Sequence, residues 1–233
     1  MLLRSITKHI KGQNWFAVFI DFLIVVVGVF IGLQVGNWNE AVKERAKEKL
    51  VNEQLVEEFT AAGELSRTAR VGNDESLEAI REVLRVIRDG NEPEDKEAFL
   101  KSLRLAGSLK SGPSEPVTLI ELLSSGGLSE LSSPKLRTAL VQYHEISTQQ
   151  VELSSLVLQR ISMPHDGFHH AIHVNPDFDP TLDNFFAKYE WDLIDDTRQQ
   201  FQVLLYGKLV LQYIINEQIT RGEAVLAELR SAQ

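Results

Sequence analysis

The sequence contains no cysteine among its 233 residues. It can therefore form no disulfide, no cysteine-bound metal site and no thiolate nucleophile, although this absence selects neither side of a membrane. Basic residues are also in the minority, with 24 Lys and Arg against 33 Asp and Glu. Seven of the basic and four of the acidic residues lie in residues 1–49, so residues 50–233 carry 17 basic and 29 acidic side chains. This acidic balance argues against a nucleic-acid partner, because phosphates bind basic surfaces.

The signatures of several enzyme classes are missing as well. There is no Gly-x-Ser-x-Gly, no His-Glu-x-x-His, no phosphate-binding glycine-rich loop and no dinucleotide fingerprint. The run Ser124-Ser125-Gly126-Gly127 offers a serine nucleophile, but it follows a predicted helix and is more typical of a helix end. Asp192, Asp195 and Asp196 could hold a cation, but such a run is also typical of a solvated helix start. The sequence therefore predicts a protein that is not an enzyme and holds no cofactor.

One long apolar run is present. Residues Phe16–Val35 include a single formally charged side chain, Asp21. Trp15 and Trp38 flank the run and lie about 35 Å apart on a helix that rises roughly 1.5 Å per residue. This spacing matches a hydrocarbon core of about 30 Å with an aromatic anchor at each interface, and it predicts a transmembrane helix over residues 14–38. The alternatives are a core helix, which is rarely apolar on every side, and a cleaved signal peptide, whose apolar region is shorter.

Small residues recur inside this run. Gly28, Gly32 and Gly36 are spaced by four residues, and Asp21 precedes Gly28 by seven, so all four share one helix face. In lipid, small residues let helix backbones approach closely, so this face predicts a membrane-protein partner or a second copy of the chain. Asp21 has two interpretations. An ionisable side chain in a span faces protein or water and suggests a function, but Asp21 is also near enough to Trp15 to reach the headgroup layer.

Basic residues flank the apolar run on both sides. Residues 1–13 contain apolar and basic side chains in a pattern that predicts a short interfacial helix. A short basic tail before an uncleaved span favours a cytoplasmic N-terminus. We therefore expect the lipid bilayer of a bacterial inner membrane as the location, with the acidic C-terminal domain in the periplasm. The basic residues near the two ends of the span are Arg4, Lys8, Lys11, Lys43, Arg45, Lys47 and Lys49.

The rest of the chain predicts helices only. Residues 39–72 contain strong helix formers and charges at i, i+4 spacing, which predict a helical stalk that continues the span. Val71-Gly72-Asn73-Asp74 predicts a helix break, and residues 73–233 form a helical bundle domain. No alternating run or hairpin signal predicts a strand. The fold class is thus all-α: one N-terminal transmembrane helix that continues into a stalk, followed by an antiparallel helical bundle.

Helix boundaries within the domain follow from local signals. Asp89-Gly90-Asn91 predicts the end of one helix, and Pro93 is expected in the first turn of the next. A short helix over Val117–Leu123 ends at the serine–glycine run, and Ser133-Pro134 predicts the start of a long helix that ends before Pro164. The last helix is expected to begin near Asp183 or Asp192. Its predicted buried face comprises Phe201, Leu204, Leu205, Leu211, Ile215 and Ile219.

Histidines cluster in the least regular part of the sequence. His165, His169 and His173 are spaced by four residues, and on one helix they would line a face able to bind zinc. Pro164, Gly167 and the Asn175-Pro176 pair make a long regular helix there unfavourable. We therefore interpret the segment as a surface connection without a metal, with these histidines as weak metal candidates and a proton-sensing role as a further alternative.

Two stretches resemble a known family. Gln34-Val35-Gly36-Asn37-Trp38-Asn39-Glu40 and residues Thr118–Ile146 resemble an uncharacterised family of bacterial single-span membrane proteins, whose members pair such an anchor with a helical domain. Family members often have Glu where this chain has Asp21, and Asn near Gly36. The resemblance implies a fold and a membrane location, and no activity.

A shorter stretch resembles a second group. Phe19-Ile20-Asp21 and the apolar run after it are similar to the single span of ion-driven stator subunits of the TonB and Tol systems, but nothing downstream resembles their exterior domain. Our first hypothesis is a membrane-anchored scaffold or accessory, regulatory subunit of a membrane complex. The alternative is an energy-coupling subunit that protonates Asp21, and a metal-binding or enzymatic role of residues 165–173 is third.

Overall fold

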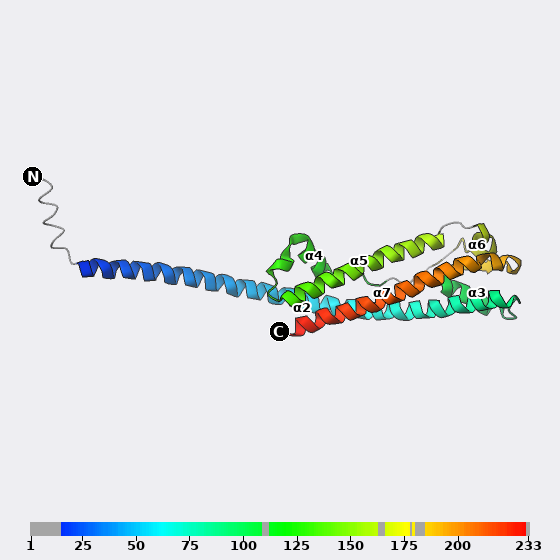
Figure 1. Cartoon of the computed structure of the whole chain (residues 1–233), viewed down its shortest axis with the longest axis horizontal. Helices are drawn as coiled ribbons and strands as arrows, with labels where there is room; N and C mark the ends of the chain where they lie inside the picture. Colours follow the sequence, from blue (N-terminus) through cyan, green and yellow to red (C-terminus); the bar gives the residue numbers. More distant parts are fainter. Residues whose placement is uncertain (1–14, 109–111, 163–165, 178, 180–184, 232–233) are drawn as a thin grey trace, which may run out of the picture. The chain divides into compact units, whose positions relative to one another are not determined.

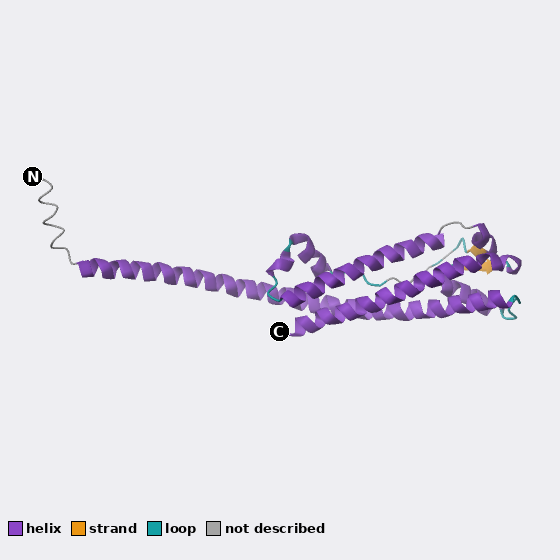
Figure 2. Cartoon of the chain, in the orientation of Figure 1, coloured by secondary structure: helices purple, strands orange, loops and turns teal. Residues whose placement is uncertain are grey.

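The computed structural model of the chain describes residues 15–108, 112–162, 166–177, 179 and 185–231. These residues are mostly helical with little strand (Figures 1 and 2). The chain divides into two units, Met1–Val51 and Asn52–Gln233. The elements in order are α2 (Trp15–Asp89), α3 (Lys96–Gly107), α4 (Val117–Ser125), η1 (Gly127–Glu130), α5 (Pro134–Ser162), α6 (Asp166–Ala171), β1 (Ile172–Val174), β2 (Phe186–Tyr189), η2 (Trp191–Thr197) and α7 (Arg198–Ser231).

Helix α2 runs without interruption from Trp15 to Asp89. It contains the apolar run and the predicted stalk in one helix, as the strong helix formers after Trp38 predict. Residues 52–72, the second half of the predicted stalk, belong to the unit Asn52–Gln233. The interfacial helix expected over residues 1–13 lies outside the described residues.

The predicted helix break at Val71–Asp74 is wrong, because α2 continues through it. A glycine inside a helix costs about 1 kcal/mol relative to alanine, but here tertiary hydrogen bonds oppose that cost. Asn73 is buried, and its Nδ2 donates to the Lys208 carbonyl at 3.2 Å and to Gln212 Oε1 at 2.6 Å. Gln212 Nε2 in turn donates to Asp74 Oδ1 at 2.6 Å. Bonds to α7, more than 130 residues away, thus hold the helix together where the local signal disfavours it.

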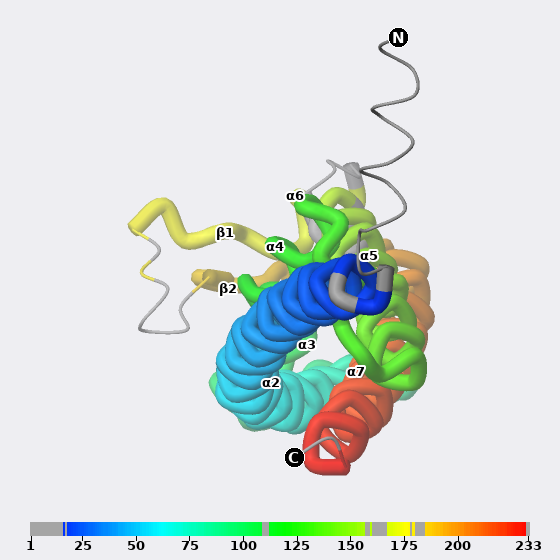
Figure 3. Tube along the Cα trace, turned by 90° about the vertical axis from the view of Figure 1, so that its left-hand side faces the viewer, coloured from blue at the N-terminus to red at the C-terminus, as the bar shows by residue number. Residues whose placement is uncertain are grey.

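Three long helices lie side by side in the unit Asn52–Gln233: α2 from Asn52 onward, α5 and α7 (Figures 1 and 3). A layer of buried polar side chains connects them. Ser66 Oγ on α2 donates to Gln218 Oε1 on α7 at 3.4 Å, and Gln218 Nε2 donates to Ser147 Oγ on α5 at 3.3 Å. Because Asn73 on α2 meets Gln212 on α7, later residues of α2 contact earlier residues of α7, so the two helices are antiparallel.

The predicted apolar face of α7 is confirmed. Phe201, Leu204, Leu211 and Ile215 are buried, and Leu205 and Ile219 are partly buried against the core. Burial of each such side chain contributes about 1.5–3 kcal/mol. One apolar cluster joins the C-terminal part of α2 to α3, α6, both strands, η2 and the start of α7. Its most buried members are Ile80, Val83, Leu103, Ala106, Ala171, Ile172, Phe186 and Phe201.

Most helix ends follow their predicted signals. Helix α2 ends at Asp89, and Gly90 takes the left-handed conformation with φ of 73°. Leu136 N donates to Ser133 Oγ at 3.2 Å, so Ser133 caps α5 as predicted. The position predicted for Pro93 is wrong. Asp95 caps α3 instead, by accepting a hydrogen bond from Ala98 N at 2.9 Å, so the helix begins three residues after the proline.

A residue 60 positions earlier in the chain caps α4. The carboxylate of Glu58 on α2 accepts hydrogen bonds from Thr118 N at 3.0 Å and from Thr118 Oγ1 at 2.9 Å. A negative charge at a helix N-terminus satisfies an unpaired N–H and interacts favourably with the helix dipole. Gly126, with φ of 74°, ends α4 within the predicted serine–glycine run.

The absence of strand expected from the sequence is wrong. Strands β1 and β2 pair antiparallel, with a register shift between His173 and Val174, and lie to one side of the long helices (Figure 3). Runs of three and four residues are too short to give an alternating pattern. Helix α7 also begins later than expected: the 3₁₀-helix η2 occupies Trp191–Thr197, and α7 begins at Arg198.

Candidate functional site

The apolar run of α2 is exposed on every side. Each large apolar side chain described between Phe16 and Val35 is at least 38% exposed, and one helix in the described residues is long and apolar enough to cross a membrane. No part of its most apolar window is buried within the chain. The later part of α2, which belongs to the unit Asn52–Gln233, differs, because its apolar side chains at Leu55, Phe59 and Ile80 are at most 1% exposed.

The predicted glycine face lies on this continuous helix. Around Gly28, Gly32 and Gly36, no atom of the described residues lies within 4 Å of the position that a Cβ would occupy. Space inside the chain therefore does not require glycine at these positions. Asp21 lies on the same helix, within the exposed run. Trp38 is 70% exposed, and Trp15 begins the helix.

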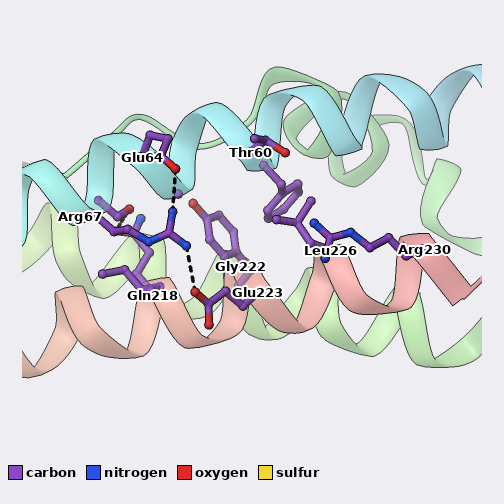
Figure 4. A pocket seen from close by; sticks show the side chains of 13 residues that line it. Thr60, Glu64, Arg67, Gln218, Gly222, Glu223, Leu226 and Arg230 are labelled. Carbon is purple, nitrogen blue, oxygen red and sulfur yellow. Dashed lines mark hydrogen bonds and ion pairs between the residues drawn. The ribbon is translucent and has the colours of Figure 1, made fainter.

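A cavity of about 180 Å³ lies between α2, α5 and α7 (Figure 4). Its apolar side is formed by Phe59 and Tyr143, whose rings meet edge to face with centroids 4.7 Å apart, together with Ile219 and Leu226. The remaining lining residues are Thr60, Gly63, Glu64, Ser66, Arg67, Gln218, Gly222, Glu223 and Arg230.

Charges surround the exposed side of this cavity in equal number. Arg67 Nη1 pairs with Glu64 Oε1 at 3.0 Å on α2, and its Nη2 reaches Glu223 Oε1 on α7 at 2.9 Å (Figure 4). The Arg67 side chain is 42% exposed, and both carboxylates are more exposed. With Arg230, the lining carries two positive and two negative groups. The cavity therefore has no net formal charge.

Three polar side chains of the lining are buried: Ser66, Tyr143 and Gln218. Tyr143 is 2% exposed, and its hydroxyl makes no hydrogen bond with the described residues. Burial raises the pKa of this phenol, whereas the neighbouring Ser147 and Gln218 side chains lower it. Both side chains therefore lie close to the Tyr143 hydroxyl. They form a hydrogen bond with each other, and neither forms one of normal geometry with the hydroxyl.

The histidines do not share one helix face. His165 lies outside the described residues, His169 is in α6, and His173 is in β1 because α6 ends at Ala171. This confirms that no long regular helix runs through the segment. His173 Nε2 lies 3.3 Å from Glu190 Oε1, and Lys188 Nζ lies 2.7 Å from the same oxygen.

Two neighbouring side chains lower the pKa of Glu190. Lys188, and to a smaller degree His173, lowers the pKa of Glu190. Within the ranges that the structure describes, no group of three histidine, aspartate or glutamate side chains is placed to hold a metal ion.

The other polar runs have local structural roles. Ser124 and Ser125 each donate to the Glu121 carbonyl at the end of α4, at 3.1 and 2.6 Å. Asp192, Asp195 and Asp196 lie in η2 directly before α7, and Asp195 pairs with Arg198. Both runs therefore sit at helix ends, as their sequence pattern indicates.

Sequence reasoning missed the cavity. Its one readable signal is the presence of Gly63 and Gly222 within long runs of helix formers, which costs helix stability. That these two glycines line one cavity depends on the packing of α2 against α7. Comparison of the chain with protein-family models, with curated proteins and with solved structures finds no match.

Proposed function

We propose that the chain is a single-pass, membrane-anchored helical protein that acts as a scaffold or accessory subunit of a membrane complex. The observation that supports this is the uncovered apolar run of α2. Fifteen large apolar side chains between Phe16 and Val35 are exposed by 38% or more. Since transfer of one such side chain out of water contributes about 1.5–3 kcal/mol, leaving the whole run in water would cost tens of kcal/mol. A bilayer removes this cost.

The alternative of a soluble core helix is less consistent with these exposures. A core helix buries its apolar side chains against its own domain, whereas no part of the most apolar window of this run is buried. The remaining alternative, a cleaved signal peptide, differs in a measurable way. A protein that retains the run has the full mass of the printed sequence, 26.3 kDa.

The anchoring proposal is tested by fractionation and mass measurement. Membranes from expressing cells are washed with alkaline carbonate, which removes peripheral proteins, and the extracted protein is weighed by intact mass spectrometry. We expect the chain in the carbonate-resistant fraction at full mass. Recovery in the soluble fraction would contradict an anchor. So would a measured mass too small by about the first 40 residues, at roughly 0.1 kDa per residue, because it would show that the run is cleaved.

We further propose a cytoplasmic N-terminus and a periplasmic acidic domain at a bacterial inner membrane. The support is the short basic segment ahead of the span. Alkaline phosphatase fused after Gln233 should be active, because it folds only in an oxidising compartment. The control is β-galactosidase fused at the same position. Activity of the second fusion instead of the first would reverse the orientation.

The proposed contact of the anchor with its partner is the face formed by Gly28, Gly32 and Gly36, with Asp21 beside it. An isoleucine at Gly32 adds a branched side chain where two backbones approach, so Gly32→Ile should abolish crosslinks between anchors. Phe30→Ile, nearly opposite on the helix, is the matched control and should leave crosslinking intact. Equal crosslinking in both variants would remove the glycine face from the proposal.

Asp21→Asn separates the scaffold from the energy-coupling alternative. Asparagine keeps the shape and hydrogen bonding of the side chain but cannot titrate. A scaffold needs only a polar group at this position, so Asp21→Asn should assemble and support the same co-purifying proteins. A variant that assembles normally but is inactive in the complex would favour the proton-driven subunit.

A further inference from the structure

The cavity between α2, α5 and α7 contains two glycines that the backbone does not need. Gly63 and Gly222 lie inside helices, and among the described glycines only Gly90 and Gly126 have positive φ. A Cβ on Gly222 would lie 3.5 Å from the Tyr143 ring, and a Cβ on Gly63 would lie 3.6 Å from Arg67 Nη1. Both distances are ordinary van der Waals contacts. Alanine would thus fit at either position and would favour the helix.

What the two glycines provide is space. They lie on facing helices and line the same cavity. A protein selected only for a stable three-helix core would gain from filling this space, because voids lose dispersion contacts along their whole lining. The glycines therefore indicate that the space itself is used.

The lining indicates the chemical class of the occupant. A void of about 150 Å³ lined by apolar side chains takes benzene in other proteins, so a cavity of this size suits a molecule of roughly six to nine non-hydrogen atoms. Phe59, Ile219 and Leu226 offer an apolar wall. The two arginines and two glutamates of the lining compensate each other, so neither an anion nor a cation is favoured. The occupant is therefore neutral and largely apolar.

Tyr143 differs from the other buried polar residues of the lining, Ser66 and Gln218, which bond to each other. Its hydroxyl is buried and without a hydrogen-bond partner among the described residues, although the residue lines the cavity. A buried hydroxyl that makes no hydrogen bond destabilises a fold unless something else satisfies it. A hydroxyl or carbonyl group on a bound molecule would do so.

We propose that this cavity is a binding site for a small neutral molecule, with an aromatic or branched apolar body and one hydroxyl or carbonyl group. The apolar body lies against Phe59 and Leu226, and the polar group bonds to the Tyr143 hydroxyl. Arg67 bridges α2 and α7 at the exposed side, through Glu64 and Glu223. Ligand exchange requires this exposed bridge to open, which is easy because such ion pairs are weak.

The test uses two probes that differ by one hydroxyl. The full chain in lipid nanodiscs is titrated with 4-fluorophenol or with fluorobenzene, and ¹⁹F line broadening reports binding. Probes of seven or eight non-hydrogen atoms bind weakly, so a ligand-observed method is required. We expect saturable binding of both probes above that of empty nanodiscs, with 4-fluorophenol bound about fivefold more tightly, as one hydrogen bond gives.

Gly222→Val fills the cavity, and Ala224→Val is its control. Both add a β-branched side chain to the same helix, but Ala224 is exposed and does not line the cavity. We expect Gly222→Val to weaken both probes at least tenfold and Ala224→Val to change neither by more than about twofold. If circular dichroism shows that Gly222→Val is unfolded, Gly63→Val is used in its place, because it fills the same cavity from α2. If a folded cavity-filling variant binds the probes as tightly as Ala224→Val does, the proposed binding site is wrong.

Tyr143→Phe tests the hydroxyl. It should weaken 4-fluorophenol about fivefold, leave fluorobenzene unchanged, and leave the melting temperature of the free protein the same or higher, since it removes an unsatisfied polar group. A lower melting temperature with unchanged preference for 4-fluorophenol would make the hydroxyl structural and overturn the proposed contact. Absence of saturable binding of either probe would mean a cavity filled by water only, and would overturn the proposal as a whole.

Discussion

Helix α2 contains two regions with similar apolar side chains and opposite surroundings. In residues 16–35 the valines, isoleucines and phenylalanines are exposed all round, whereas Leu55, Phe59, Ile80 and Val83 are at most 1% exposed. The second region also buries polar side chains, among them Ser66, Asn73 and Ser76. The difference shows that apolar content alone does not define a core. The run without polar partners suits lipid, where backbone groups must bond within the helix, and the amphipathic region suits packing in water.

The largest expected effect comes from charging the first region. Val25→Arg with Val29→Arg should cost about 5–7 kcal/mol in membrane insertion, at roughly 2.5–3.5 kcal/mol per arginine near the centre of a span. The double variant should leave the carbonate-resistant membrane fraction.

The matched control charges exposed positions of the second region. Leu65 and Val71 are 57% and 53% exposed, so Leu65→Arg with Val71→Arg should stay in the membrane fraction and unfold at nearly the wild-type temperature. If the variant with Val25→Arg and Val29→Arg remains in the membrane fraction, the two regions of α2 do not differ in the way described.

A smaller effect is expected in the core of the second unit. Leu211 is fully buried against Ala69 and Ile215, so Leu211→Ala should lower the free energy of unfolding by about 2–5 kcal/mol. Leu209, two residues earlier and 44% exposed, is the control, and Leu209→Ala should cost less than about 1 kcal/mol. Urea unfolding followed by circular dichroism measures both variants. Similar losses would show that α7 buries a different face from the one described.

The smallest effect concerns the polar contacts that distinguish the second region. Asn73→Ala removes the hydrogen bonds to the Lys208 carbonyl and to Gln212. We expect a loss of about 1–2 kcal/mol, because the Lys208 carbonyl and the Gln212 side chain lose a donor while alanine favours the helix. Glu75→Ala, at an exposed position of the same helix, should change the stability by less than about 0.5 kcal/mol. A stabilised Asn73→Ala variant would assign the continuity of α2 to helix propensity instead of these bonds.

The sequence allowed prediction of features that depend on nearby residues. The apolar run, the cap at Ser133, the end of α2 at Gly90 and the buried face of α7 each follow from local spacing or from one backbone conformation. The continuity of α2 through Asn73 could not be predicted, since it depends on hydrogen bonds to a helix that follows more than a hundred residues later.

The remaining misses have the same origin. Strand β1 has three residues and a register shift beside His173. Its pairing with β2 is a tertiary contact, and such a short strand gives no alternating sequence pattern. Pro93 did not start a helix because Asp95 provided a better cap. The cavity was hidden because Gly63, Tyr143 and Gly222 come from three separate helices. The exposed run was predictable as a segment, but the partner of its glycine face remains a proposal.

The pairing of α2 with α7 has a consequence for folding during synthesis. Ser66 bonds to Gln218, 152 residues later, and Arg67 pairs with Glu223, 156 residues later. At roughly 5–20 residues per second, the ribosome needs about 8–30 s to make the partner after α2 has emerged. During that interval Phe59 and Ser66 lack the residues of α7 beside which they lie in the folded chain, Gly222 and Gln218. The nascent domain is therefore open to aggregation and to chaperone binding until its last helix is complete.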